Sequence, residues 1–273
     1  MGPHLLLCIA LALVGAGLLQ CRPLGARKAG LLVLWLATGV LLWTVTGRWW
    51  AGAAGLLAWI AFPLWELVAV LRRLQIPRER RLEDAFLPAG EARGEVEALT
   101  GEMEALGFRH VGDCDLVPAA QRQFFRLFDR GDGLHQGFIG WVGEEEVGFH
   151  FAAFLSQDEG GRYWMTWNYP LSYGLRIPPR LALYRALDCA TLADLFAGHR
   201  DLLAINEVGD DRLRSVVGLD SVRRRLETVL ARQLRYNVQI GILTRRGVAG
   251  GFRYSWRGAF RVAGEVFRDL ARL

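Results

Sequence analysis

Three long apolar runs begin the chain, and a sequence of mixed polarity follows them. The runs cover about residues 3–20, 29–47 and 49–71. A helix that crosses the hydrocarbon core of a bilayer needs about 20 apolar residues, within a range of roughly 17 to 25. The second and third runs reach this length, and the first reaches it when its uncharged flanks are counted. The pattern predicts a membrane domain of three transmembrane helices in residues 1–71.

The first run has two alternative interpretations. It could be a cleaved signal peptide, or the stretch GLLQC could direct lipid attachment to Cys21. The N-terminal MGPH lacks the basic residues of a signal peptide. Gln20 also stands where a lipoprotein signal has a small residue. We therefore prefer an uncleaved span.

Basic residues near the apolar runs predict the orientation of the membrane domain. The loop RPLGARK after the first run carries three positive charges, whereas the turn after the second carries only Arg48. The third run is followed by Arg72, Arg73, Arg78, Arg80 and Arg81. Because basic loops stay in the cytoplasm, we expect a multi-pass inner-membrane protein with its N-terminus outside and its C-terminal domain in the cytoplasm. Lys28 is the only lysine beside 32 arginines, which indicates a GC-rich, bacterial genome.

Glu66 is the one acidic residue of the predicted membrane domain. It lies five residues before Leu71, so a rise of 1.5 Å per residue places it about 7 Å from the inner end of the span. That shallow depth favours an interfacial carboxylate, paired with Arg73, Arg27 or Lys28, over a proton or ion site.

Small residues predict close helix packing on the third span. Ala51, Ala54, Ala58 and Ala61 recur at spacings of three and four residues and form one helix face. The partner could be the second span, a second copy of the chain or another subunit. Packing within the chain is the preferred interpretation.

The sequence after the third span predicts a linker and then an α+β domain. Residues 72–90 are rich in arginine and proline and predict a basic juxtamembrane linker. Residues 108–187 contain aromatic and β-branched runs separated by GDG, GEEE and QDEGG, which predict an antiparallel β-meander. Helical periodicity appears at about residues 91–106, 191–204, 220–236 and 256–273. The fold class is therefore a membrane-anchored α+β protein with a cytosolic domain over residues 91–273.

The last helix is amphipathic and lies in a basic part of the chain. Residues 72–211 carry 15 arginines and 23 acidic residues, a net charge of −8, whereas residues 212–273 carry 14 arginines and four acidic residues, a net charge of +10. Such a helix can lie on anionic lipid. Alternatively, its apolar stripe of Phe260, Ala263, Phe267 and Leu270 closes the core of the domain. The candidate membrane-surface residues are Arg72, Arg73, Arg78, Arg261, Arg268 and Arg272.

The sequence contains no motif that indicates a particular reaction. The chain lacks a Gly-rich phosphate loop, a GxSxG motif and an HExxH motif. Its four cysteines are scattered, so we expect neither a disulfide framework nor a metal site, and no cofactor. Nucleic-acid binding is not expected, because the soluble part has no broad basic surface. If the protein is an enzyme, the scattered candidates are Asp113, His135, His150, Trp167 and Arg176.

The stretch RYWMTWNYPLSYGLRIPP predicts a possible groove. On an extended strand Tyr163, Met165, Trp167 and Tyr169 share one face, and Trp164, Thr166 and Asn168 share the other. If one face stays open, the groove for a ligand or partner comprises Trp164, Trp167, Asn168, Tyr173 and Arg176. Because aromatic residues strongly favour burial, a core role is the alternative.

These features predict a non-catalytic, membrane-anchored protein that presents an α+β domain at the inner leaflet. Its expected partners are the lipid bilayer and a protein partner or a second copy of the chain, with anionic lipid as a further candidate. The alternatives are a membrane-bound enzyme with a site in the cytosolic domain and an accessory subunit of a larger membrane complex.

Overall fold

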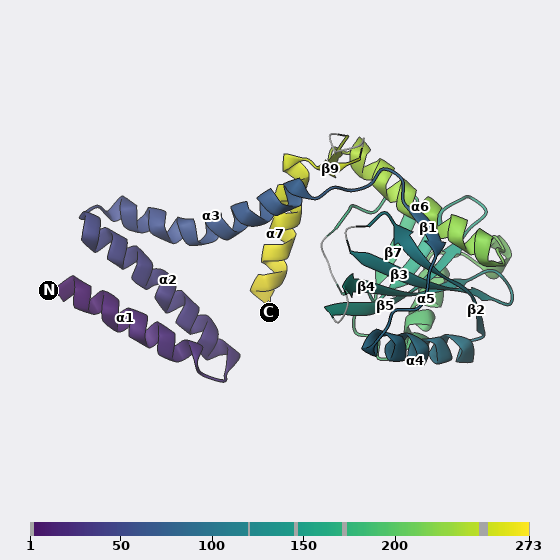
Figure 1. Ribbon diagram of the computed structural model, residues 1–273, viewed down its shortest axis with the longest axis horizontal. Coiled ribbons are helices and arrows are strands. Elements are labelled where there is room, and N and C mark those ends of the chain that lie inside the picture. Colours follow the sequence, from purple (N-terminus) through teal and green to yellow (C-terminus); the bar gives the residue numbers. More distant parts are fainter. Residues whose placement is uncertain (1–2, 120, 145–146, 171–173, 246–250, 273) are drawn as a thin grey trace. The chain divides into compact units, whose positions relative to one another are not determined.

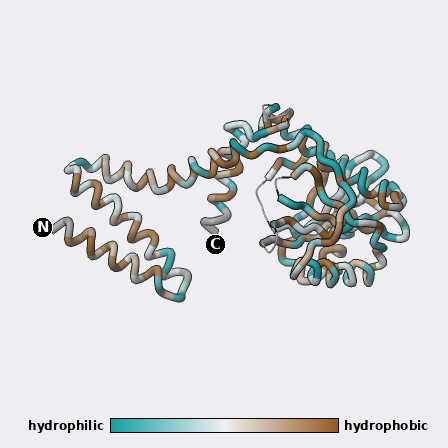
Figure 2. Tube along the Cα trace, viewed as in Figure 1, coloured by the Kyte–Doolittle hydropathy of each residue, from teal (hydrophilic) through white to brown (hydrophobic). Residues whose placement is uncertain are grey.

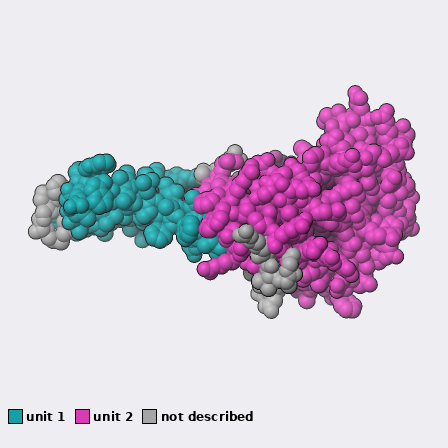
Figure 3. Space-filling view, turned by 90° about the horizontal axis from the view of Figure 1, so that it is seen from above, with its two compact units in different colours: residues 1–70 teal, residues 71–273 magenta. Residues whose placement is uncertain are grey.

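The structure is a computed structural model that describes residues 3–119, 121–144, 147–170, 174–245 and 251–272 (Figure 1). The chain divides into two compact units, residues 1–70 and 71–273 (Figure 3). Unit 1 is helical, and unit 2 is built on a β-sheet.

Unit 1 contains the helices predicted from the apolar runs. They are α1 (Pro3–Leu19), α2 (Leu24–Thr46) and α3 (Trp49–Arg73), whose last three residues belong to unit 2. Figure 2 shows hydrophobic residues along most of their length. The helical segments Gly25–Thr46 and Trp49–Arg73 are long and apolar enough to cross a membrane, whereas the apolar part of α1, Leu6–Leu19, is shorter than such a span.

Glycines bring the helices of unit 1 into close contact. A Cβ atom added to Gly30 would lie 2.8 Å from the carbonyl oxygen of Gly15, and one added to Gly52 would lie 2.7 Å from that of Gly39. Gly52 and Gly55 are buried, whereas Ala54 and Ala61 are exposed. Ala51 and Ala58 of the predicted alanine face are half-buried. The closest approach on α3 is at Gly52, because a residue without a side chain lets the backbones meet at this distance.

Glu66 is exposed on α3. Within the described part of unit 1, its carboxylate makes no ion pair with Arg27 or Lys28. The predicted pairing with these two cations is therefore not seen.

Unit 2 contains a seven-stranded sheet with the strands in sequential order. The strands are β1 (Arg81–Asp84), β2 (Phe108–Val117), β3 (Arg122–Arg130), β4 (Gln136–Glu144), β5 (Val147–Gln157), β6 (Tyr163–Trp167) and β7 (Leu181–Arg185). Neighbours from β1 to β6 pair antiparallel, which confirms the predicted meander, and β7 pairs parallel to β6.

Helices cover both faces of this sheet (Figure 1). Helices α4 (Glu91–Ala105) and α5 (Leu192–Ile205) pack on one face, and α6 (Leu219–Gln239) packs on the other. On α6, the predicted core residues Val222, Leu226, Val229 and Leu234 are all buried. The fold class is thus α+β with a mostly antiparallel sheet between two helical layers.

Burial on both faces explains why the central strands are so apolar. On β3, Phe124 and Phe128 pack toward α4 and α5, whereas Phe125 and Leu127 pack toward α6. Successive side chains of a strand point to opposite faces, so a strand covered on both faces needs an almost continuous apolar run.

The predicted linker contributes to the sheet. Leu82, within β1, is buried, and its backbone N–H donates to Glu227 Oε1 of α6 at 2.8 Å. Just after α3, Ile76 forms a bridge with Phe252, through backbone hydrogen bonds of 2.8 and 2.7 Å. Residues 72–90 are therefore held to the α+β domain rather than separate from it.

The C-terminal part of unit 2 comprises a small hairpin and a helix. Strands β8 (Leu243–Thr244) and β9 (Arg253–Tyr254) precede α7 (Trp256–Arg272). The buried face of α7 includes Ala259, Val262 and Ala263, whereas Phe260 is 46% exposed. Of the predicted apolar stripe, Ala263 is buried and Phe267 is half-buried, whereas the side chain of Leu270 lies outside the description. Arg261 of α7 pairs with Glu265 at 2.7 Å.

Candidate functional site

A pocket with a volume of about 340 Å³ lies beside the C-terminal end of α5 in unit 2. His135, Leu203 and Val208 contribute its inner lining. Its exposed charged residues are Arg200, Glu207 and Asp210. His135 immediately precedes β4, and its side chain is in the core apart from the part that lines this pocket.

A chain of four buried polar side chains leads from the pocket into the core. His135 Nδ1 lies 2.8 Å from Ser156 Oγ, which lies 3.0 Å from His199 Nε2. His199 Nδ1 in turn lies 3.2 Å from Thr166 Oγ1. These residues come from the β3–β4 turn, β5, β6 and α5, so the tertiary fold alone brings them together.

The hydrogen bonds of this chain allow one consistent arrangement of its protons. Among the residues that the structure describes, the Thr166 hydroxyl has His199 Nδ1 as its one acceptor. If Thr166 donates there, His199 Nε2–H donates to Ser156, and the Ser156 hydroxyl donates to His135 Nδ1. His135 then presents Nε2–H to the pocket, where no described side chain accepts it. In this arrangement the pocket contains a donor that no described side chain uses.

Both histidines are held in the neutral form. Burial, with a smaller contribution from His135, lowers the pKa of His199 to about 3. Burial also lowers the pKa of His135, although Asp132 acts in the opposite direction. A neutral imidazole donates with one nitrogen and accepts with the other, which is what a relay of hydrogen bonds requires.

The polar chain offers a hydrogen-bonding group to a molecule in the pocket, but it exposes no nucleophile there. Ser156 has an exposed fraction of 0% and is enclosed between the two imidazoles. A substrate in the pocket would therefore meet His135 and not the Ser156 hydroxyl. At the pocket, the site therefore offers a hydrogen bond from His135, the residue at the end of the polar chain.

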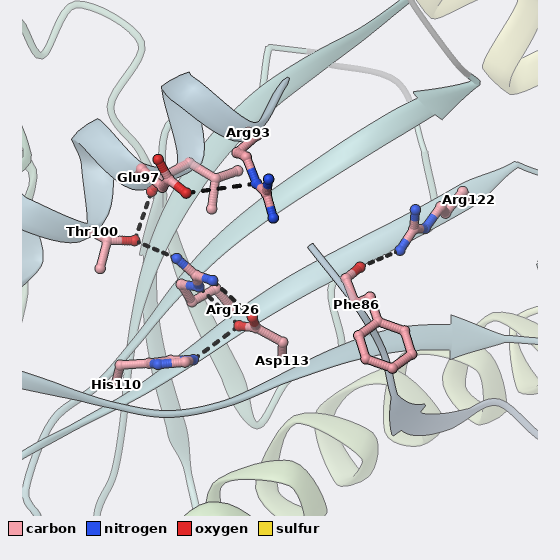
Figure 4. A network of polar contacts seen from close by, with 9 residues as sticks. Phe86, Arg93, Glu97, Thr100, His110, Asp113, Arg122 and Arg126 are labelled. Atoms are coloured by element: carbon pink, nitrogen blue, oxygen red, sulfur yellow. Dashed lines mark hydrogen bonds and ion pairs between the residues drawn. The ribbon is translucent and has the colours of Figure 1, made fainter. Parts of the chain in front are cut away.

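Asp113, one of the enzyme candidates, is fully engaged by neighbouring residues (Figure 4). Arg126 donates to both of its carboxylate oxygens at 2.8 Å, and His110 Nε2 lies 2.9 Å from Oδ1. Burial by itself would raise the pKa of Asp113, but the bonds from Arg126 and His110 outweigh it and lower that pKa to about 2. Arg126 also donates to Thr100 of α4 at 3.1 Å, which ties the strand pair to this helix. A carboxylate with this pKa is a weak base at neutral pH.

The other enzyme candidates lie apart from the pocket. His150 of β5 pairs with Glu95 of α4. Trp167 of β6 stacks on Tyr169 with ring centroids 5.1 Å apart. The backbone of Arg176 is held by the side chain of Asn237, which accepts from its N–H and donates to its carbonyl oxygen, both at 2.8 Å. Only His135 of the five candidates contributes to the polar chain.

The residues predicted to form an aromatic groove are largely structural. Trp164 is 2% exposed, packs with Leu203 and Leu213, and donates to Asp158 at 3.1 Å. Asn168 accepts from the N–H of Ala152 at 2.7 Å. Tyr173 lies outside the described residues. The two faces of β6 are both covered, so its aromatic rings serve the core.

The predicted membrane-surface arginines divide into engaged and exposed residues. Arg72 donates to the carbonyl oxygen of Tyr254 at 3.0 Å and lies over the ring of Trp256, and Arg261 pairs with Glu265. The exposed ones are Arg73, Arg78 and Arg268. Arg272 lies in α7, and its side chain is outside the description.

Sequence reasoning missed three members of the polar chain. His199 stands on the buried stripe of α5 with Leu192, Leu195, Phe196 and Leu203, where a polar residue is unexpected. A polar residue at a core position of an amphipathic helix is a usable signal. Ser156 and Thr166 carry a weaker signal, because a single hydroxyl in an apolar strand is common.

In the part of the chain that the structure describes, no group of three or more His, Cys, Asp or Glu side chains is placed to hold a metal ion. The cysteines Cys8, Cys21, Cys114 and Cys189 are free. Comparison of the chain with known protein families, with curated proteins and with solved structures gives no match.

Proposed function

We propose that the protein is a membrane-anchored, non-catalytic binding protein whose cytoplasmic α+β domain takes a small polar ligand in the His135 pocket. The observation that carries this proposal is the buried polar chain that ends at the pocket. Burying four polar side chains is unfavourable unless each is hydrogen-bonded, and here one donor is left for a molecule in the pocket.

The pocket defines the class of ligand. Its volume of about 340 Å³ is at the lower end of the range for small-molecule sites, roughly 300 to 1,000 Å³. An acceptor oxygen on the ligand would receive the His135 Nε2 proton, and apolar atoms would contact Leu203 and Val208. Arg200 beside Glu207 and Asp210 gives charges of both signs. An uncharged or zwitterionic molecule with a carbonyl or carboxylate group fits this lining best.

The membrane part of the proposal is supported by two helices that are long and apolar enough to span a bilayer. The arginine distribution favours a cytoplasmic location for the domain. A reporter that works only in the cytoplasm should be active when fused after Leu273, and one that works only in the periplasm should be inactive there. Release of the full chain from membranes by alkaline carbonate would contradict the anchorage itself.

A thermal-shift screen with a panel of small metabolites tests the pocket. The full-length protein in mild detergent should be stabilised by at least one compound, and Ala204→Trp, which fills the pocket, should abolish that shift. Ala197→Trp is the matched control, since Ala197 is an exposed residue of the same helix that does not line the pocket. Equal shifts in both variants would contradict the site.

The same samples distinguish a binding protein from an enzyme. Mass spectrometry of the compounds after incubation should show them unchanged. Turnover that Ala204→Trp abolishes would favour the enzyme alternative. The protein partner or second copy predicted from the sequence is tested separately by co-purification in mild detergent.

A further inference from the structure

A basic groove lies between residues 78–81 and helix α6, on unit 2 and apart from the His135 pocket. Its volume is about 450 Å³. Its lining includes five arginines, namely Arg78, Arg80, Arg81, Arg224 and Arg235, and two glutamates, Glu79 and Glu227. We use "basic groove" for this set.

Most of the positive charge in the basic groove lacks an acidic partner. Glu79 pairs with Arg81 at 3.4 Å, and Glu227 accepts from the N–H of Leu82 at 2.8 Å. Four of the five arginines form no ion pair with any described residue: Arg78, Arg80, Arg224 and Arg235. Guanidinium groups that line one groove without counter-charges attract anions.

Arg80 indicates the kind of group that the basic groove would bind. Its Nε is sealed from solvent and has no hydrogen-bond acceptor among the residues described. Burial lowers the pKa of Arg80, because it removes water that would stabilise the charged guanidinium. A buried cationic N–H without an acceptor is unfavourable, and an anionic oxygen that reached it would satisfy it.

Phosphate is the anion that fits several guanidiniums at once. Each guanidinium can donate two parallel hydrogen bonds to phosphate oxygens, and a phosphate offers oxygens to more than one arginine. A carboxylate has two oxygens, whereas the phosphodiester of a lipid headgroup has two charged oxygens and two further ester oxygens that accept weakly.

Chain connectivity identifies the source of the phosphate. Arg73 is the last residue of α3, and Arg78 follows it by five residues. Five extended residues span at most about 18 Å. If α3 crosses the bilayer as proposed above, Arg78 stays within that distance of the end of a span.

We propose that the basic groove binds the phosphate group of an anionic phospholipid headgroup. This inference rests on the membrane attachment in the proposed function and does not depend on the His135 pocket. It also assigns a role to arginines of α6, which are distant in sequence from the membrane helices.

The test uses the full chain in nanodiscs of phosphatidylcholine, with or without phosphatidylglycerol, and native mass spectrometry of the lipids that remain bound. The groove variant is Arg224→Gln/Arg235→Gln, in which both arginines are exposed on α6. The control variant is Arg180→Gln/Arg212→Gln, which removes the same charge from exposed positions outside the groove. Because both variants keep the apolar helices, lipids around those helices cancel in the comparison.

Wild type and control should retain phosphatidylglycerol in preference to phosphatidylcholine. Each near-surface arginine is worth roughly fivefold in binding, so the groove variant should lose about 25-fold of that preference. An unchanged preference in the groove variant would overturn the proposal. Binding of inorganic phosphate without any preference for phosphatidylglycerol would also overturn it, in favour of a soluble phosphate ligand. Failure of the chain to enter nanodiscs would instead count against the proposed membrane attachment.

Discussion

Arg126 of β3 and Asp113 of β2 form a bidentate ion pair, in which the guanidinium donates two hydrogen bonds of 2.8 Å to the carboxylate. Both side chains are largely buried, with exposed fractions of 11% and 16%. The pair links strands near one edge of the sheet and, through Thr100, links them to α4.

Replacing Asp113 with Asn should lower the free energy of unfolding by about 2 kcal/mol at pH 7, because Arg126 would keep a buried charge without its counter-ion. Urea unfolding of the full chain in detergent measures this loss. Asp115→Asn is the matched control, since its pair with Arg122 is more exposed and should contribute less than about 1 kcal/mol. Similar losses in the two variants would contradict the role given to Asp113.

The same pair should make the free energy of unfolding depend on pH in the acidic range. The pKa of Asp113 is 3.8 when unperturbed and about 2 in the fold. Between these values the unfolded chain binds a proton that the folded chain does not, so stability is present above about pH 4 and is lost as the pH falls toward 2. The wild type should lose more stability over this range than Asp113→Asn.

His199 should produce a separate pH dependence at milder acidity. Its pKa falls from 6.5 to about 3 in the fold. The unfolded chain therefore binds the extra proton between these values, and stability is lost as the pH falls below about 6.5. At pH 5 the loss should reach about 2 kcal/mol. His199→Gln should remove up to one proton from the slope of unfolding free energy against pH, while His135 accounts for the remainder. An unchanged slope would mean that His199 is accessible to protons in the folded state.

Arg72 should hold the C-terminal hairpin to the last turn of α3. Its guanidinium donates to the Tyr254 carbonyl and lies 4.4 Å from the Trp256 ring centroid. Arg72→Gln should speed amide exchange at Phe252 by roughly 5- to 30-fold, which corresponds to the loss of about 1 to 2 kcal/mol. Arg73→Gln is the control, because Arg73 is exposed, and equal effects of both substitutions would rule out a specific role for Arg72.

Gly140 should be intolerant of a side chain. A Cβ atom there would overlap the ring of Phe151 on the neighbouring strand. Gly140→Ala should therefore destabilise the protein by about 1 to 3 kcal/mol, because a packed core cannot make room. In contrast, Gly94→Ala, on an open face of α4, should stabilise it by about 0.5 to 1 kcal/mol. Thermal unfolding of both variants provides the measurement.

Local sequence patterns predicted most elements of unit 2. The β-meander and helices α4, α5 and α6 follow from periodicity and turns, and Gly107 ends the first of these helices with a positive φ of 82°. β1 was not predicted, because RLED is only four residues long and stands in a segment rich in arginine and proline. Its place at the edge depends on contacts with β2 and Glu227, which no local pattern reveals.

The candidate site was much harder to predict than the fold. His135 was one of five scattered candidates, and its partners lie 21 to 43 residues from one another along the polar chain. Sequence shows that these residues are polar, but only the folded sheet shows that they are neighbours. The basic groove was only partly predicted from the sequence. Arg78 was predicted at the membrane surface, whereas Arg224 and Arg235 follow it by 146 and 157 residues.

The strand β1 determines where a soluble fragment of this protein can be cut. A fragment that begins at Glu91 would leave the long strand β2 with an open edge, and its free N–H and C=O groups would template aggregation. A fragment that begins at Gln75 would retain both the Ile76 bridge and the outer strand. In the sequence, the globular domain thus begins directly after the last turn of α3, and a truncation has to be placed between these two points.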